Sequence, residues 1–245
     1  MTSINQSQHS CSYLRGMNWH TFKYLDTRLY ELSRYITLDQ DNKDIWSEAL
    51  ADLLILTGSA VDTFFRDMGG CPYIQAEPYF KKVQSQVVNR YWDMCDFRDA
   101  YDSIYELSEN EVDVPFGLRY YGKIRPFRQF KVNKNPGWWD AYNHLKHSFY
   151  KHLKEATLDN VLNCLGGLLI LNSLHKCSQE YLVLHGYLKD QYGQVNPPVL
   201  AYALGQSKIG YPTRCSVGIP LRSYIQTSTF RFDLRPDENV TVTLT

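Results

Sequence analysis

The sequence predicts a mainly α-helical protein: a helical bundle with a short extended excursion and a small β-rich C-terminal tail. Three observations predict this class. Apolar residues recur every three or four positions over long stretches before residue 112 and after residue 136. Glycines and prolines punctuate residues 112–136, and short segments near the C-terminus alternate polar and apolar side chains. The composition, with 44% hydrophobic and 21% charged residues among 245, is that of a chain with a sizeable core.

The first half of the chain predicts three helices. Residues 1–17 are polar and are expected to form a flexible arm. Residues 22–36 then carry apolar side chains at alternating steps of three and four, which indicates an amphipathic helix. A second helix with a similar apolar stripe is expected over about residues 44–68. A third and longer helix is expected over about residues 78–107, although charged residues interrupt its apolar period.

A helix with an unusual sequence follows the excursion. Residues 112–136 are rich in Tyr, Phe and Ile between their glycines and prolines, which indicates extended segments or a small hairpin. Asn135, Pro136 and Gly137 then open a helix, because proline suits the first helical position. We call this helix the motif helix, and its sequence is Trp138-Trp139-Asp140-Ala141-Tyr142-Asn143-His144-Leu145-Lys146-His147.

The last predicted helix, from Leu158 to about His185, is apolar nearly all round at first and is therefore expected to be central. Gly166 and Gly167 lie inside it. Because each interior glycine costs about 1 kcal/mol relative to alanine, the pair indicates close approach of a neighbouring helix. Residues 186–245 contain prolines, glycines and alternating segments, which predict loops and strands packed on the bundle.

The expected organisation is an arm at 1–17, a bundle domain at 18–185 and an appendage at 186–245. The six cysteines form no C-x-x-C pair, and residues 1–12 lack the basic and apolar regions of a signal peptide, so we predict a cytoplasmic protein with reduced thiols. The longest apolar stretch, residues 161–174, is too short to span a bilayer, so no membrane partner is expected.

The formal net charge is zero, but the charges are segregated along the chain. Residues 93–113 hold eight acidic residues and one arginine, whereas residues 119–154 hold nine lysines and arginines and one aspartate. A basic block of this kind can bind phosphate. It can equally pair with the acidic segment, within the chain or across a dimer. The sequence leaves both interpretations open.

Several familiar catalytic signatures are absent. The chain has no P-loop, no G-x-G-x-x-G, no H-E-x-x-H, no G-x-S-x-G and no paired Cys/His zinc spacing, so no cofactor is expected. His144 and His147 are three residues apart and could share a metal ion, but spacing places no third ligand beside them. The prediction is therefore that the chain has no metal site.

One edge of the motif helix carries groups suited to chemistry. Asn143 and His147 are four residues apart and share a helix face, with Lys146 beside them. An imidazole can transfer a proton near neutral pH, and a lysine can bind phosphate. The structural alternative is that Asn143 and His147 hydrogen-bond the preceding excursion and hold it in place.

The segment from Asn135-Pro136 through the motif helix to Ala156-Thr157-Leu158 resembles the HEPN superfamily, in particular its microbial branches with a W-x-x-Y-N-x-x-K-H core. The resemblance covers about residues 112–185. It implies a helical bundle that dimerises. Many members of the superfamily are metal-independent ribonucleases of toxin–antitoxin and antiviral systems, and they use an R-x(4–6)-H motif with a polar residue after the arginine.

On this resemblance, His147 matches the histidine of the motif and Asn143 matches the polar residue, whereas the arginine position falls on the uncharged Tyr142. In an active enzyme, His147 would transfer the proton and Asn143 would orient the reacting groups, while Lys146 would bind phosphate together with Arg125 and Arg128. The residues expected to bind the RNA phosphates are Arg125, Arg128 and Lys151.

Two functional hypotheses follow. The first is an RNA-directed HEPN-like protein of microbial stress or defence, either a metal-independent endoribonuclease or a degenerate RNA-binding relative, acting as a homodimer. The second is a non-enzymatic helical module for dimerisation or for binding a protein partner through a surface rich in tyrosine, of which the chain has 19. The basic block favours the first hypothesis, and the missing arginine favours the second.

Overall fold

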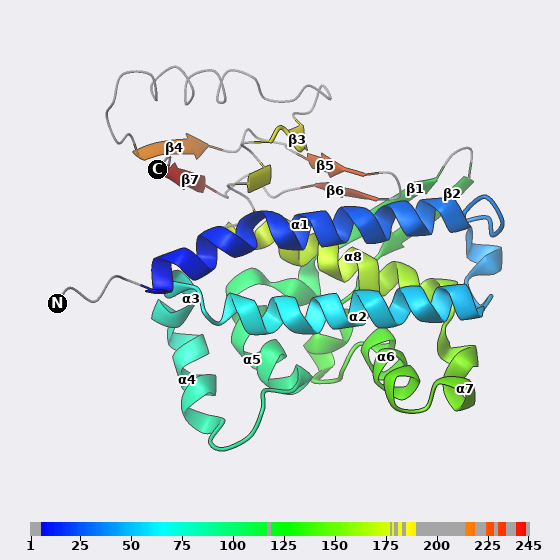
Figure 1. The fold of residues 1–245 in the computed structure, drawn as a ribbon, viewed down its shortest axis with the longest axis horizontal. Coiled ribbons are helices and arrows are strands. Elements are labelled where there is room, and N and C mark those ends of the chain that lie inside the picture. The colour runs from blue at the N-terminus through cyan, green and yellow to red at the C-terminus, as the bar shows by residue number, and fades with distance from the viewer. Residues whose placement is uncertain are drawn as a thin grey trace.

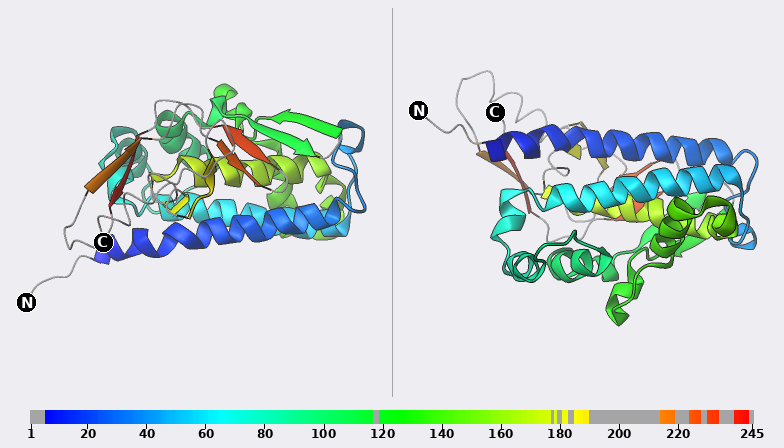
Figure 2. Two further views of the ribbon diagram at one scale, coloured as in Figure 1. Left: turned by 90° about the horizontal axis from the view of Figure 1, so that it is seen from above. Right: turned by 60° about the horizontal axis from the view of Figure 1, so that its bottom comes forward.

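The computed structural model describes residues 6–116, 119–176, 178, 181–182, 185–189, 214–218, 224–227, 230–233 and 239–243. The mainly helical class is confirmed. A layer of helices carries a small sheet along one side, next to α1 and α8 (Figures 1 and 2). The helices are α1 (Gln6–Leu32), α2 (Glu48–Met68), α3 (Pro72–Ala76), α4 (Pro78–Gln86), α5 (Met94–Tyr105), α6 (Gly137–His147), α7 (Phe149–His152) and α8 (Leu158–Leu174). Four short 3-10 helices are described between them: η1 (Gln40–Asn42), η2 (Leu107–Glu109), η3 (Arg128–Val132) and η4 (Leu153–Glu155).

Helix α8 lies at the centre of the bundle, as its apolar sequence predicts. It packs against α1, α2 and α6, and its residues from Cys164 to Leu174 are all buried. Helix α2 packs in turn against α1 and α6. The motif helix is α6. Its packing against α2 and α8 holds it on the core.

Three helix boundaries differ from the predicted ones. The structure places residues 6–17 of the predicted arm in α1, because a helix already fixed by its buried residues extends cheaply into a polar sequence. The third predicted helix is divided into α4 and α5. Asn89 has a φ of 61°, and Asp93 caps α5 with its own capping box. Helix α8 ends at Leu174 because the backbone of His175 is extended.

The predicted excursion is a hairpin of β1 (Val112–Phe116) and β2 (Arg119–Ile124), which are antiparallel, so this prediction is confirmed. The hairpin does not stand alone. It continues through β6 (Arg231–Asp233), β5 (Tyr224–Gln226) and β3 (Leu188–Lys189) into one sheet of order β2-β1-β6-β5-β3. The strands β4 (Arg214–Gly218) and β7 (Asn239–Thr243) form a separate pair. One sheet therefore crosses the predicted boundary at residue 186.

The glycine pair of α8 does mark a close approach, but the neighbour is not a helix. A Cβ atom on Gly166 would lie 2.8 Å from Cδ1 of Ile124, the last residue of β2. A Cβ atom on Gly167 would lie 3.1 Å from the ring of Phe127. The glycines let the hairpin and the turn after it rest on the central helix. Among the described residues, no helix has the length and apolarity needed to cross a membrane.

Candidate functional site

The aromatic residues of α6 hold the motif helix in the core. Trp138 and Tyr142 are 2% and 1% exposed. The indole Nε1 of Trp138 donates to the carbonyl oxygen of Pro126 at 2.8 Å, so this side chain ties the helix to the segment after β2. The ring of Tyr142 lies directly against Gly58 of α2. These contacts fix where the polar edge of α6 lies.

The polar edge of α6 is only partly free for chemistry. The amide Nδ2 of Asn143 donates to the carbonyl oxygen of Trp139 at 3.1 Å, which is a bond within its own helix. Lys146 is exposed, and its Nζ donates to the hydroxyl of Tyr142 at 3.3 Å. His147 is exposed at the last position of α6. The sequence allowed Asn143 to hydrogen-bond the preceding excursion. In the structure, Trp138 makes that link through its bond to Pro126.

The predicted phosphate-binding residues Arg125 and Arg128 lie at the other end of α6. They line a pocket with Gly137, the first residue of the helix. His147 follows Gly137 by ten residues, which corresponds to about 15 Å along a helix axis. Lys151 lies beyond His147, on α7, and is exposed. Within one chain, the structure therefore separates Arg125 and Arg128 from His147.

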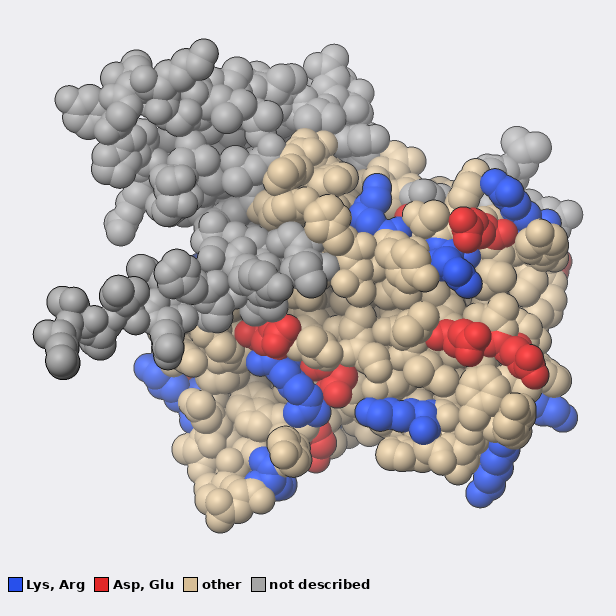
Figure 3. All heavy atoms as spheres, viewed as in Figure 1, with Lys and Arg blue, Asp and Glu red and all other residues tan. Residues whose placement is uncertain are grey.

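The acidic and basic segments pair partly with each other. Arg125 binds Glu111 at 3.0 Å, Lys123 binds the other oxygen of Glu111, and Lys131 binds Glu109 at 2.6 Å. Hydrogen bonds from Lys123 and then Arg125 lower the pKa of Glu111. The intrachain interpretation of the segregated charge is thus confirmed for these residues. Over the described part of the face drawn in Figure 3, basic and acidic side chains are interspersed.

A polar pocket of about 210 Å³ lies where β2, η3, the start of α6 and the start of α8 meet. The charged residues that line it are three cations, Lys123, Arg125 and Arg128, and one carboxylate. That carboxylate, Asp159, accepts a hydrogen bond of 2.7 Å from the hydroxyl of Tyr121. The lining residues are Gln40, Tyr121, Lys123, Ile124, Arg125, Pro126, Arg128, Gln129, Gly137, Trp138, Asp159, Asn160 and Asn163.

Arg128 is the cation of this pocket that an anion could engage most directly. It is exposed, and the structure gives it no ion pair among the residues described, whereas Lys123 and Arg125 share Glu111. The first turn of α6 faces the same space through Gly137 and Trp138. A helix start carries partial positive charge and free N–H groups, so it adds to the attraction for an anion.

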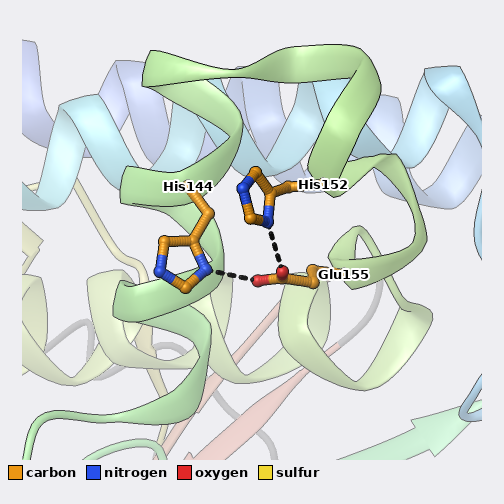
Figure 4. A group of neighbouring side chains, drawn as sticks. All are labelled: His144, His152 and Glu155. Carbon is orange, nitrogen blue, oxygen red and sulfur yellow. Dashed lines mark hydrogen bonds and ion pairs between the residues drawn. The ribbon is translucent and has the colours of Figure 1, made fainter.

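A second polar cluster, which the sequence did not reveal, lies around the C-terminal end of α6 (Figure 4). Glu155 of η4 accepts hydrogen bonds from Nδ1 of His144 at 2.7 Å and from Nδ1 of His152 at 2.6 Å. Burial of the Glu155 carboxyl opposes its ionisation, but the two imidazoles outweigh this and lower its pKa. The signal in the sequence is H-x7-H-x-x-E. In one regular helix, His152 and Glu155 would lie about 12 and 16 Å from His144 along the axis, so only a helix break can bring the three side chains together.

A comparison of the chain with protein-family models, with curated proteins and with solved structures finds no match. The HEPN resemblance therefore remains a prediction.

Proposed function

We propose that this chain is an RNA-binding protein built on an HEPN-like helical bundle, and that its polar pocket holds a backbone phosphate. The observation that supports the proposal is Arg128, a cation without an ion pair among the described residues, in a pocket that also contains the start of α6. Arg125 and Lys123 add positive charge at the rim. Phosphates are bound in proteins by this combination of guanidinium and helix N-terminal N–H groups.

The same geometry favours binding over cleavage. Tyr142 is buried against Gly58, so the position that corresponds to the arginine of the ribonuclease motif holds a core side chain. The amide of Asn143 serves the backbone of its own helix. The proposal is therefore the degenerate RNA-binding relative, and it includes the predicted homodimer, a cytoplasmic location and a role in microbial stress or defence.

Replacing Arg128 by alanine is expected to weaken RNA binding about 10-fold near 0.1 M salt and to reduce the salt slope by about 1, because one phosphate contact is lost. Fluorescence anisotropy with a labelled structured RNA, at several salt concentrations, measures both quantities. Lys134→Ala is the matched control, since Lys134 is an exposed cation of the same basic block that does not line the pocket. Equal losses for the two variants would contradict phosphate binding in the pocket.

Replacing His147 by alanine is expected to change neither RNA affinity nor RNA integrity, because His147 lies at the end of α6 away from the pocket. The measurement is incubation of the wild-type chain and the variant with structured RNA in EDTA, followed by gel analysis. Cleavage that persists in EDTA and disappears in the variant would overturn the binding-only proposal in favour of the metal-independent endoribonuclease.

One observation favours the second hypothesis, a module that binds protein. A mainly aromatic pocket of about 390 Å³ lies between α2, α4 and α5, and one of its lining residues, Tyr91, is 89% exposed. Large aromatic side chains in such settings suit protein partners. Its aromatic lining residues are Phe65, Phe80, Tyr91, Trp92, Phe97 and Tyr101. If the wild-type chain shows no salt-dependent RNA binding, this alternative is the one that remains.

A further inference from the structure

The cluster of His144, His152 and Glu155 brings together three metal-binding side chains from three successive elements, α6, α7 and η4. One ligand atom from each residue lies within 4.8 Å of the other two. The two imidazole rings lie side by side, with centroids 4.6 Å apart, and both turn Nδ1 toward the same carboxylate (Figure 4). The three groups therefore converge on one point.

We propose that His144, His152 and Glu155 bind a divalent transition-metal ion, with zinc as the preferred ion. The two imidazole Nδ1 atoms and one carboxylate oxygen are the protein ligands. The remaining coordination position is open to water, because the three side chains are 52%, 21% and 39% exposed. This site is separate from the polar pocket, and it requires neither RNA binding nor RNA cleavage.

The ligand chemistry selects the class of ion. Two histidines and one glutamate form one of the ligand sets of zinc sites that keep an open position. Imidazole nitrogen suits zinc, copper, nickel and cobalt, whereas magnesium and calcium prefer oxygen ligands. A site in which two of the three ligands are nitrogen therefore favours a transition metal over the alkaline-earth ions.

Only small movements are needed to form the site. With metal–ligand distances of about 2.0–2.2 Å, the ligand atoms of a tetrahedral site lie about 3.4 Å apart. The Nδ1 atoms of His144 and His152 lie 2.7 and 2.6 Å from different oxygens of Glu155, Oε2 and Oε1, and one ligand atom of each residue lies within 4.8 Å of the others. The separation of each pair of ligand atoms must therefore change by about 1.5 Å or less. Partly exposed side chains can make such a shift by rotation without moving the core.

The backbone around the cluster is held in place, which lowers the entropic cost of binding an ion. Ser148 breaks the helix with a φ of −154°, and this turn brings His152 back toward His144. The amide of His152 donates to the carbonyl of Ser148 at 3.2 Å. Asn160 of α8 donates to the backbone carbonyl of Glu155 at 2.8 Å, so the central helix holds the backbone of Glu155 in place.

The test is a titration of Zn²⁺ into the full, tag-free chain, freed of metal with a chelator and kept reduced at pH 7.5. Each titration is carried out with the wild-type chain and repeated in the Cys95→Ser background, because Cys95 is an exposed thiol that could bind zinc by itself. Calorimetry is expected to show one equivalent of zinc. The affinity is expected to fall at least about 100-fold in His152→Ala and in Glu155→Gln.

His147→Ala is the matched control, because His147 is an exposed histidine of the same helix outside the cluster, and its zinc affinity is expected to be unchanged. A measurement that needs no variant supports the titration. In the wild-type chain, Zn²⁺ is expected to shift the NMR signals of two of the seven histidines at one equivalent.

Two results would overturn the proposal. The first is the absence of saturable one-to-one zinc binding by the wild-type chain. The second is an equal loss of affinity in His147→Ala and His152→Ala, which would indicate non-specific binding to surface histidines. In either case, the cluster serves only as a hydrogen-bonded tie between α6 and η4.

Discussion

Replacing Gly58 by alanine is expected to lower the free energy of unfolding by about 3 kcal/mol, which is the cost of overpacking a tightly packed core. An added Cβ atom would lie 2.4 Å from both Cγ and Cδ2 of Tyr142. Cγ is the ring carbon bonded to Cβ, so it cannot move aside without moving the whole ring, and Tyr142 is only 1% exposed. The helices α2 and α6 must therefore move apart, and the melting temperature should drop by roughly 6–12 °C.

Urea denaturation of the variant and the wild-type chain measures this loss. Gly137→Ala is the matched control, because nothing lies within 4 Å of a Cβ atom on Gly137 and alanine favours the helix. In a double-mutant cycle, Tyr142→Leu should recover part of the loss in the Gly58→Ala background, since the two residues are in contact. Additive effects would show that the contact between Gly58 and Tyr142 does not set the cost.

The protein is expected to lose stability on mild acidification because of His175. This imidazole is 4% exposed, and burial lowers its pKa to about 3. Cys71 Sγ lies 3.3 Å from Nε2 of His175, and the hydroxyl of Ser178 lies 3.4 Å from Nδ1. Among the described contacts of this ring there is no carboxylate that would stabilise a positive charge on it. The rings of Phe64 and Tyr73 pack against it. The folded state therefore holds this histidine neutral.

The direction of the effect follows from proton binding. In the unfolded chain the imidazole has its ordinary pKa of 6.5, so between pH 6.5 and about 3 the unfolded state binds the additional proton. The contribution of His175 is complete above pH 6.5 and is lost as the pH falls, by up to about 1.4 kcal/mol per pH unit. Asp96 and Glu111, whose pKa values are lowered, lose their contributions only in the more acidic range where carboxylates protonate.

Urea unfolding at pH 7, 6 and 5 separates these groups. His175→Gln should reduce the dependence of stability on pH in this window, because glutamine does not titrate. His147→Ala should retain the wild-type dependence, since His147 is exposed. An unchanged slope in His175→Gln would contradict the assignment of the acid sensitivity to this residue.

The local features of this chain were predictable because they depend on neighbours in the sequence. Periodicity predicts α2 and the burial of α8, and the glycines and prolines after residue 112 predict the β1–β2 hairpin. The motif helix is recognisable for the same reason. Arg125 and Arg128 could be proposed as phosphate ligands from the basic block alone, and both line the polar pocket.

The pairing of distant segments could not be predicted in this way. Asp113 of β1 pairs with Arg231 of β6, more than a hundred residues away, and this pairing unites the hairpin and the tail in one sheet. A glycine pair indicates close approach of another segment but does not say which segment approaches. The expected neighbour of Gly166 was a helix, and the structure places Ile124 of β2 there. The ion pairs of Glu111 with Lys123 and Arg125 were also not predictable, because they depend on the register of the β1–β2 hairpin.

The amino-acid sequence by itself determined the helical class, the position of the motif helix and the residue types available for phosphate binding, because periodicity and composition act over a few residues. Only the tertiary structure decided how those residues combine. It placed Arg128 and His147 at opposite ends of α6, and it turned the chain at Ser148 so that His144 meets His152. The physical reason is that sites form where backbone turns and core packing bring side chains together, and neither is encoded in the spacing of two residues.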